Sequence, residues 1–187
     1  MKTQIIRATA LIAMLGVGSI ALAENRNSIN IKTASFTLNE TNQNIGLSTY
    51  VFDESSSSVF SVEYERRFGK DLSWGVETTS YSNDIISGAS FSDKLDTLLV
   101  MGTVRKYFKV SKYVQPFIGA GAGVSVATIE GSGSGIGFQG MAGIKFPFDS
   151  ISAILEYKFI SSEAEDDFGS TVDVSGSGVF AGIGFNF

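Results

Sequence analysis

The chain has 187 residues with 14 basic and 19 acidic side chains, and its formal net charge of −5 argues against nucleic acid as a partner. It contains no cysteine, which excludes disulfides and thiolate metal sites, and no histidine. Glycine is abundant at 21 residues, whereas proline is limited to 2. The length suits a single domain.

The first 23 residues have the pattern of a secretory signal peptide. Lys2 and Arg7 give a basic start, an apolar run follows over residues 8–22, and Ala21-Leu22-Ala23 is a small-x-small cleavage site. The run is shorter than the ~20 residues that a membrane-spanning helix needs. We therefore expect residues 1–23 to be cleaved and residues 24–187 to form the mature domain.

Seven segments alternate apolar with small or polar residues, a period of two that indicates β-strands with one apolar face. The first strand is ambiguous, because residues 28–38 alternate poorly and residues 44–52 alternate about as well. Both alternatives stay open. The seven clearer segments are 59–68, 72–82, 95–108, 114–129, 136–148, 151–162 and 172–187.

The predicted connections alternate in length. Short turns at 69–71, 109–112 and 149–150 follow every second strand, and polar stretches rich in Ser, Gly and acidic residues separate the others. Such alternation is typical of membrane β-barrels. The longer stretches are predicted at 39–57, 83–94 and 163–171, with a shorter one at 130–134. Aromatic residues that we expect to form an interfacial girdle near the short turns are Phe68, Trp74, Tyr107, Phe108, Tyr113, Phe117, Phe146, Phe148, Phe185 and Phe187.

The two faces of the predicted strands distinguish a membrane barrel from a soluble one. A soluble sandwich or a lipocalin-like binder would turn the apolar faces inward and the charges outward. Here the apolar face is long and regular, whereas the other face mixes glycines with a few charges of both signs. No segment after residue 23 resembles a membrane helix, and a sheet can span a lipid bilayer only as a closed barrel. The sequence therefore predicts an all-β fold, an eight-stranded antiparallel up-and-down transmembrane β-barrel.

In this barrel the charged face points inward. An eight-stranded barrel encloses a space just wide enough for side chains, and buried charges are tolerated when they are paired. We expect a structural network of ion pairs that fills the barrel, and the alternative is a selective pore. The residues predicted for this network are Glu63, Glu65, Arg67, Glu77, Arg105, Lys145, Glu156 and Lys158.

An enzymatic function is not expected. Hydrolases and acyltransferases that pair a serine with histidine need a neutral imidazole as the base, and this chain has no histidine. An acidic run, Glu163, Glu165, Asp166 and Asp167, has oxygen ligands suited to Ca²⁺ or Mg²⁺, but its spacing matches no EF-hand and most such runs are solvated surface. We predict no cofactor and no metal site.

The whole chain resembles the small bacterial outer-membrane β-barrel family, the OmpA/OmpX-type eight-stranded barrels. The segments that look like strands of this family are Val62-Glu-Tyr-Glu-Arg-Arg-Phe68, Gln115-Pro-Phe-Ile-Gly-Ala-Gly121 and Leu155-Glu-Tyr-Lys-Phe159, together with a last strand that ends on Phe185 and Phe187. In the family, such a terminal aromatic resembles the signal read by the barrel-assembly machinery.

This resemblance implies a location in the bacterial outer membrane, with outer-membrane lipids and lipopolysaccharide as surroundings. We expect a non-enzymatic protein that acts in envelope integrity or surface interaction through extracellular loops, and the sequence does not identify a surface ligand. The alternatives are a narrow channel for small solutes or ions and a periplasmic lipocalin-like binder.

Overall fold

The computed structural model describes residues 27–40, 42–45, 48–54, 58–87, 94–128, 132–165, 169 and 171–187. The predicted signal peptide at residues 1–23 lies outside this part of the chain. Among the described residues, no helix is long and apolar enough to cross a membrane.

The regular elements of the described chain are all strands. Eight of them form a closed antiparallel barrel, and three short ones lie at one end of it. The barrel strands are β1 (Asn27–Leu38), β4 (Ser58–Phe68), β5 (Leu72–Ser87), β6 (Lys94–Tyr107), β7 (Gln115–Thr128), β8 (Ser132–Phe148), β9 (Ile151–Glu165) and β11 (Gly176–Asn186). The short strands are β2 (Asn42–Ile45), β3 (Ser48–Phe52) and β10 (Thr171–Asp173).

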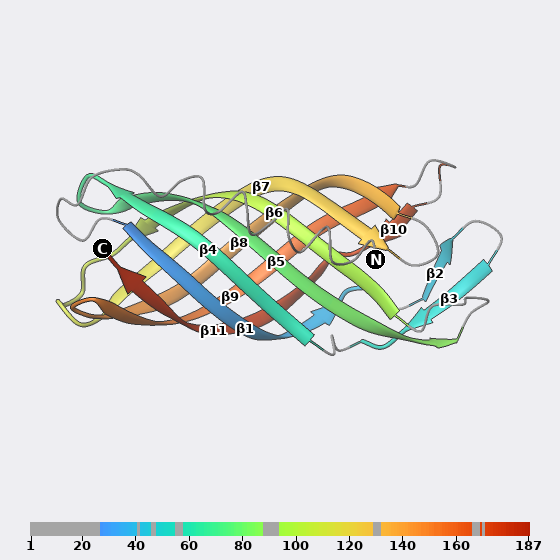
Figure 1. Ribbon diagram of the computed structural model, residues 1–187, viewed down its shortest axis with the longest axis horizontal. Coiled ribbons are helices and arrows are strands. Elements are labelled where there is room, and N and C mark those ends of the chain that lie inside the picture. The colour runs from blue at the N-terminus through green and yellow to red at the C-terminus, as the bar shows by residue number, and fades with distance from the viewer. Residues whose placement is uncertain are drawn as a thin grey trace.

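The barrel closes because β1 pairs on both of its edges. Ile31 lies opposite Val62 of β4 on one side and opposite Ile183 of β11 on the other. The remaining neighbours follow chain order, from β4 through β9 to β11. Figure 1 shows the strands wrapping obliquely around the long axis, with β2, β3 and β10 at one end and the C-terminus at the other. The predicted fold is therefore confirmed.

The position of the first strand is now settled in favour of residues 28–38, which lie within β1. The competing segment, residues 44–52, lies mostly in a hairpin of β2 and β3 that joins only the end of β5, with Val51 opposite Ser87 and Phe52 opposite Ile85. Several predicted loops are also partly strand, because β5 continues to Ser87 and β9 to Glu165. The strands at this end therefore extend beyond the alternating segments of the sequence.

The apolar faces of the strands point outward. On β9 the side chains alternate between exposed and buried along the whole strand, so that Phe159 is 49% exposed while the neighbouring Lys158 is fully buried. Ile31, Phe60 and Val104 are exposed in the same way on other strands. A lipocalin-like binder would have the reverse arrangement. The barrel therefore presents an apolar exterior and encloses its charges, as the sequence predicted.

The predicted aromatic girdle needs one correction. Phe68, Trp74, Phe108, Tyr113 and Phe148 are exposed near the short turns. Tyr107 and Phe117, however, are each only 2% exposed, and their rings contact one another inside the barrel with centroids 5.3 Å apart. Both residues lie on the inward parity of their strands, so proximity to the short turns alone was a misleading criterion.

The hairpin of β2 and β3 should be dispensable for barrel closure. Leu38 and Glu54 are already joined by a backbone hydrogen bond of 2.9 Å, and deleting residues 41–52 leaves a seven-residue connection, residues 39, 40 and 53–57, between β1 and β4. A connection of this length is within the range that joins strands in compact domains. We expect the deletion variant to insert into membranes and to keep the different gel mobility of boiled and unboiled samples. Loss of that mobility difference would show that the hairpin is required for the barrel.

Candidate functional site

The inward face of β6 shows that the interior of the barrel is built in layers. Leu99 and Met101 are buried toward the long-loop end, Thr103 and Arg105 are buried in the middle, and Tyr107 is buried toward the short-turn end. Because alternate residues of a strand share a face, this one strand contributes in turn to an apolar, a charged and an aromatic layer.

The layer nearest the long loops is a hydrophobic core. Phe36 of β1 lies at its centre, with its ring centroid 4.7 Å from that of Tyr81 and 6.4 Å from that of Phe180. The Tyr81 hydroxyl donates a hydrogen bond to the carbonyl oxygen of Val174, so that its polar atom is satisfied in this apolar setting. The buried members of this layer are Phe36, Leu38, Tyr50, Phe52, Val59, Tyr81, Leu95, Leu99, Met101, Ala127, Ile160, Ala164, Val172, Val174 and Phe180.

The middle layer is a network of buried ion pairs. Lys32 of β1 lies at its centre, with its Nζ atom 3.1 Å from Glu63, 2.6 Å from Glu77 and 2.7 Å from Glu156. All four side chains are fully buried. Charges removed from water are stabilised only by partners of this kind, so the network fixes the relative positions of four strands.

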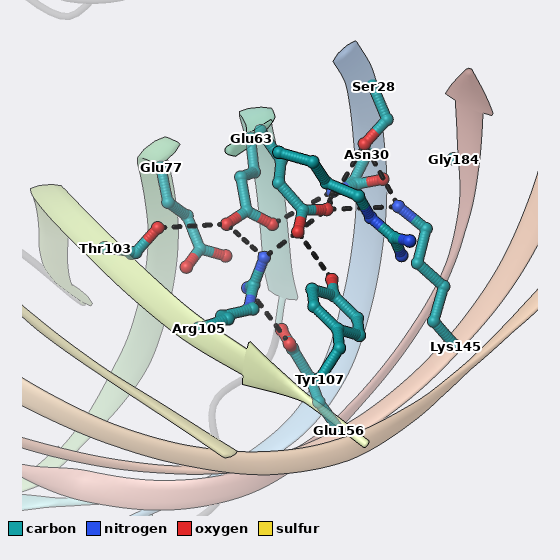
Figure 2. A network of polar contacts seen from close by, with 12 residues as sticks. Ser28, Asn30, Glu63, Glu77, Thr103, Arg105, Tyr107, Lys145, Glu156 and Gly184 are labelled. Atoms are coloured by element: carbon teal, nitrogen blue, oxygen red, sulfur yellow. Dashed lines mark hydrogen bonds and ion pairs between the residues drawn. The ribbon is translucent and has the colours of Figure 1, made fainter. Parts of the chain in front are cut away.

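Three further cations complete the network. Arg105 contacts Glu63 at 2.5 Å and Glu156 at 3.3 Å, and Figure 2 shows its guanidinium between these two carboxylates. Lys158 pairs with Glu77 and lies 3.0 Å from Glu156. Lys145 pairs with Glu65 at 3.0 Å. Lys32, Arg105, Lys145 and Lys158 therefore balance four carboxylates, those of Glu63, Glu65, Glu77 and Glu156.

Neutral side chains occupy the remaining acceptor sites of these carboxylates. Tyr107 donates its hydroxyl to Glu65 at 2.5 Å, and Thr103 donates to Glu63 at 3.3 Å (Figure 2). Ser61 donates to Glu77 at 2.5 Å. Hydrogen bonds of this type offset the cost of desolvating a charged group. The network is therefore connected beyond its ion pairs.

The structure places the predicted interior residues in one connected region, with one difference in membership. Arg67 donates to the Oε1 atom of Gln115 at 2.6 Å and stacks over the ring of Tyr107, and it forms no ion pair with a carboxylate of the described chain. Lys32 takes the central role instead. The sequence contains one signal for it, because Lys32 and Asn30 are polar residues two positions apart and therefore lie on the same face of a strand. The structure buries both of them.

A small aromatic layer lies next to the charged network on its short-turn side. Tyr107, Phe117, Met141 and Ile154 form this second buried cluster. Arg105 lies above the ring of Phe117, with its Cζ atom 5.1 Å from the ring centroid, which is a favourable cation–π arrangement. The three layers together fill the interior along most of the barrel.

The acidic run considered as a cation site is not assembled in the described part of the chain. Glu163 and Glu165 lie exposed at the end of β9, and Asp166 and Asp167 are outside the described residues. Among the described residues, no group of three histidine, cysteine, aspartate or glutamate side chains could hold a metal ion.

The terminal aromatics that we expect to act in assembly lie on the last barrel strand and just after it. Phe185 is exposed on the outer face of β11, opposite Ile29 and Ile151. The backbone of Phe187 exchanges two hydrogen bonds with Asn27, at 2.9 and 3.0 Å. The last residues are thus part of the seam where the barrel closes, and their role in assembly stays a prediction.

These features define a class of protein, a closed eight-stranded barrel with an apolar exterior and a filled, ion-paired interior. No protein-family model and no curated protein sequence matches the chain. Several solved structures, however, are similar to the chain. Neisserial surface protein A is similar with a TM-score of 0.63 at 14% identity, over 86% of this chain and 97% of that one. OprG from Pseudomonas aeruginosa is similar with a TM-score of 0.59 at 12% identity, over 87% of this chain and 96% of that one.

The chain therefore has the fold of small bacterial outer-membrane β-barrels, as the resemblance in its strands indicated. At these levels of identity the similarity describes the fold, and function has to be inferred from the chain's own side chains.

Proposed function

We propose that the protein is a sealed, non-enzymatic barrel of the bacterial outer membrane that acts in envelope integrity or surface interaction through its long-loop end. The observation that carries this proposal is the filled interior. An apolar layer, a charge-balanced layer and an aromatic layer succeed one another along the lumen. A barrel whose interior is occupied in this way acts through its surfaces and not through a pore.

The channel alternative is disfavoured by the same layers. An ion entering the lumen would have to displace Lys32 from its carboxylates and then pass between the buried rings of Phe36, Tyr81 and Phe180. Both steps break favourable contacts, and the described interior provides no polar groups that would replace the hydration shell of the ion. An enzymatic role is disfavoured by the absence of histidine from the sequence and by the engagement of the interior carboxylates in ion pairs.

The long-loop end is suited to surface interaction because its segments are held together. The side chain of Gln43 accepts a hydrogen bond from the backbone N–H of Asp173 and donates one to its carbonyl oxygen, which ties β2 to β10. The backbone N–H of Asp53 donates to the carbonyl oxygen of Asp84 at 2.8 Å, which ties the chain after β3 to β5. Such cross-links present a defined surface at little entropic cost on binding.

The exterior of the barrel supports the proposed lipid surroundings. Its outward side chains form an apolar band around the middle, with the exposed aromatics Trp74, Phe108 and Phe148 toward the short turns. Lipopolysaccharide and phospholipids would then be the immediate neighbours. We also propose that Phe185 and Phe187 present the assembly signal during insertion, because they lie on and directly beside the closing strand.

Conductance and loop dependence test this proposal together. Purified protein in a planar bilayer should give no stable single-channel current, because the lumen is filled.

A strain lacking the gene should become more sensitive to detergent or should attach less well to surfaces. The wild-type gene should restore the phenotype, whereas the variant lacking residues 41–52 should not, although it inserts normally.

Three outcomes would contradict the proposal. A stable, ion-selective current from the wild-type protein would favour the channel. Full restoration by the loop-deleted variant would show that the barrel acts without the β2–β3 hairpin. Lipid A and phospholipids that differ in mass between strains with and without the protein would indicate an enzyme.

A further inference from the structure

The short-turn end of the barrel contains a cavity of about 660 Å³, at the opposite end from the proposed interaction surface. Cavities of roughly 300–1,000 Å³ are the usual size of small-molecule sites. Residues from β1, β4, β7, β8 and β11 and from the connections that follow β6 and β8 line it, so it lies at the short-turn mouth of the barrel. The residues used below are Ser28, Arg67, Lys112, Gln115, Lys145 and Asp149.

The charge of this cavity favours an anionic ligand. Its lining includes three cations, Arg67, Lys112 and Lys145, and a single acidic side chain, Asp149. The cations come from three different parts of the chain, so they approach the cavity from different directions. A cluster of this sign inside a concave, partly enclosed site attracts and retains anions.

Arg67 has donors to spare. Its Nη2 atom donates to Gln115 at 2.6 Å, and its Cζ atom lies 4.3 Å from the centroid of the Tyr107 ring. Among the described residues, no carboxylate lies within ion-pair distance of its guanidinium. A guanidinium has five N–H donors in a planar fork that matches the oxygens of a phosphate. The stacking on Tyr107 and the bond to Gln115 hold this fork in place.

Lys145, whose charge is balanced by Glu65, provides a fixed ammonium donor on another wall of the cavity. Its side chain is only 3% exposed, and its Nζ atom contacts Ser28 at 3.1 Å and Glu65 at 3.0 Å. The ammonium group has three donors, so one remains for a ligand oxygen. Lys112 lies on the loop at the mouth, with its Nζ atom 4.7 Å from the centroid of the Tyr113 ring.

We propose that this cavity binds the phosphate group of a phosphate ester, either a soluble phosphomonoester or the headgroup of an anionic phospholipid. Arg67 binds two of the phosphate oxygens, and Lys145 and Lys112 contact the group from the other sides. The side-chain amide of Gln115, whose Oε1 atom accepts from Arg67, offers its N–H donors to hydroxyl groups on the organic part of the ligand. This site is independent of the proposed surface function at the other end of the barrel.

The test uses the full chain purified in a maltoside detergent that carries no phosphate, with glycerol 3-phosphate as the probe and glycerol as the neutral control ligand. Titration calorimetry should show saturable binding of glycerol 3-phosphate and none of glycerol. The double variant Arg67→Gln/Lys112→Gln should bind at least about tenfold more weakly, because two charge-assisted contacts are lost. Lys112→Gln alone, a change in an exposed loop, should weaken binding by about threefold even if the double variant folds poorly.

The matched control is Lys70→Gln/Lys109→Gln, which removes the same charge from exposed positions at the same end but outside the cavity. Its affinity should stay within about twofold of the wild type. The proposal is overturned if glycerol 3-phosphate shows no saturable binding, or if this control weakens binding as much as the double variant does.

The source of the phosphate is distinguished by adding phosphatidylglycerol to the micelles. Competition between phosphatidylglycerol and glycerol 3-phosphate supports the site as a lipid headgroup site. Unchanged binding of the soluble ester in the presence of the lipid supports it as a site for a soluble ligand.

Discussion

Replacing Lys32 with methionine should lower the free energy of unfolding by about 3–5 kcal/mol, the cost of removing one partner from a buried ion pair. Lys32 contacts Glu63, Glu77 and Glu156 within 3.1 Å, and none of the four side chains is accessible to solvent. The substitution removes one positive charge, so that the four carboxylates of the network face only three cations. Urea unfolding of the protein folded into lipid vesicles, followed by Trp74 fluorescence and gel mobility, measures the effect.

A second substitution should reverse part of this loss. In Lys32→Met/Glu156→Gln the remaining charges form three matched pairs, which are Arg105 with Glu63, Lys158 with Glu77, and Lys145 with Glu65. We therefore expect the double variant to be more stable than Lys32→Met by at least about 1 kcal/mol. Equal or lower stability of the double variant would show that charge balance does not govern this layer.

An exposed ion pair provides the control for these variants. Lys106 lies 3.3 Å from Asp71, and both side chains are more than one third exposed. Lys106→Met should change the free energy of unfolding by less than about 1 kcal/mol, because solvent screens the pair. A loss as large as that of Lys32→Met would show that any lysine-to-methionine change destabilises this barrel.

The outer surface of the barrel could be predicted from the sequence because its strands alternate with high contrast. On β9, charged residues such as Glu156 and Lys158 separate apolar ones such as Leu155 and Tyr157, so the period of two assigns each residue to a face. The same parity placed the predicted interior charges on the inward face. Short turns and a closing terminal strand then favoured a closed barrel.

Lys32 was missed because β1 lacks this contrast. Its outward residues include Thr33 and Ser35 alongside Ile29 and Ile31, so polar side chains occur on both faces. The alternation is then too weak to identify the strand, and the parity of Lys32 carries little weight. Its partner Glu156 is 124 residues away in the chain, and their contact depends on the stagger of strands around the barrel.

The apolar layer was missed for the opposite reason. Residues 98–101, Leu-Leu-Val-Met, are apolar on both faces of β6, since the outward ones meet the apolar exterior and the inward ones lie in the core. A continuous apolar run gives no period, so the filling of the lumen at this end cannot be read from alternation. Tyr107 shows the same ambiguity, because an aromatic residue near a short turn suits both an interfacial girdle and an interior cluster.

Replacing Phe36 with alanine should destabilise the barrel by about 3–5 kcal/mol, the usual cost of truncating a buried aromatic side chain. Phe36 is 1% exposed and contacts the rings of Tyr81 and Phe180, so its removal leaves a cavity between them as well as the loss of apolar contact. Since the neighbouring strands are closed by backbone hydrogen bonds, the barrel cannot collapse to fill this space.

Phe60 on the adjacent strand β4 is the matched control, because it is 52% exposed on the outer face. In lipid vesicles Phe60→Ala should cost about 1–2 kcal/mol, since lipid chains fill the space that the ring leaves and only its transfer free energy is lost. Urea unfolding in the same vesicles compares the two variants. If Phe60→Ala costs as much as Phe36→Ala, then lipid contact, and not the apolar layer inside the lumen, dominates the stability of this half of the barrel.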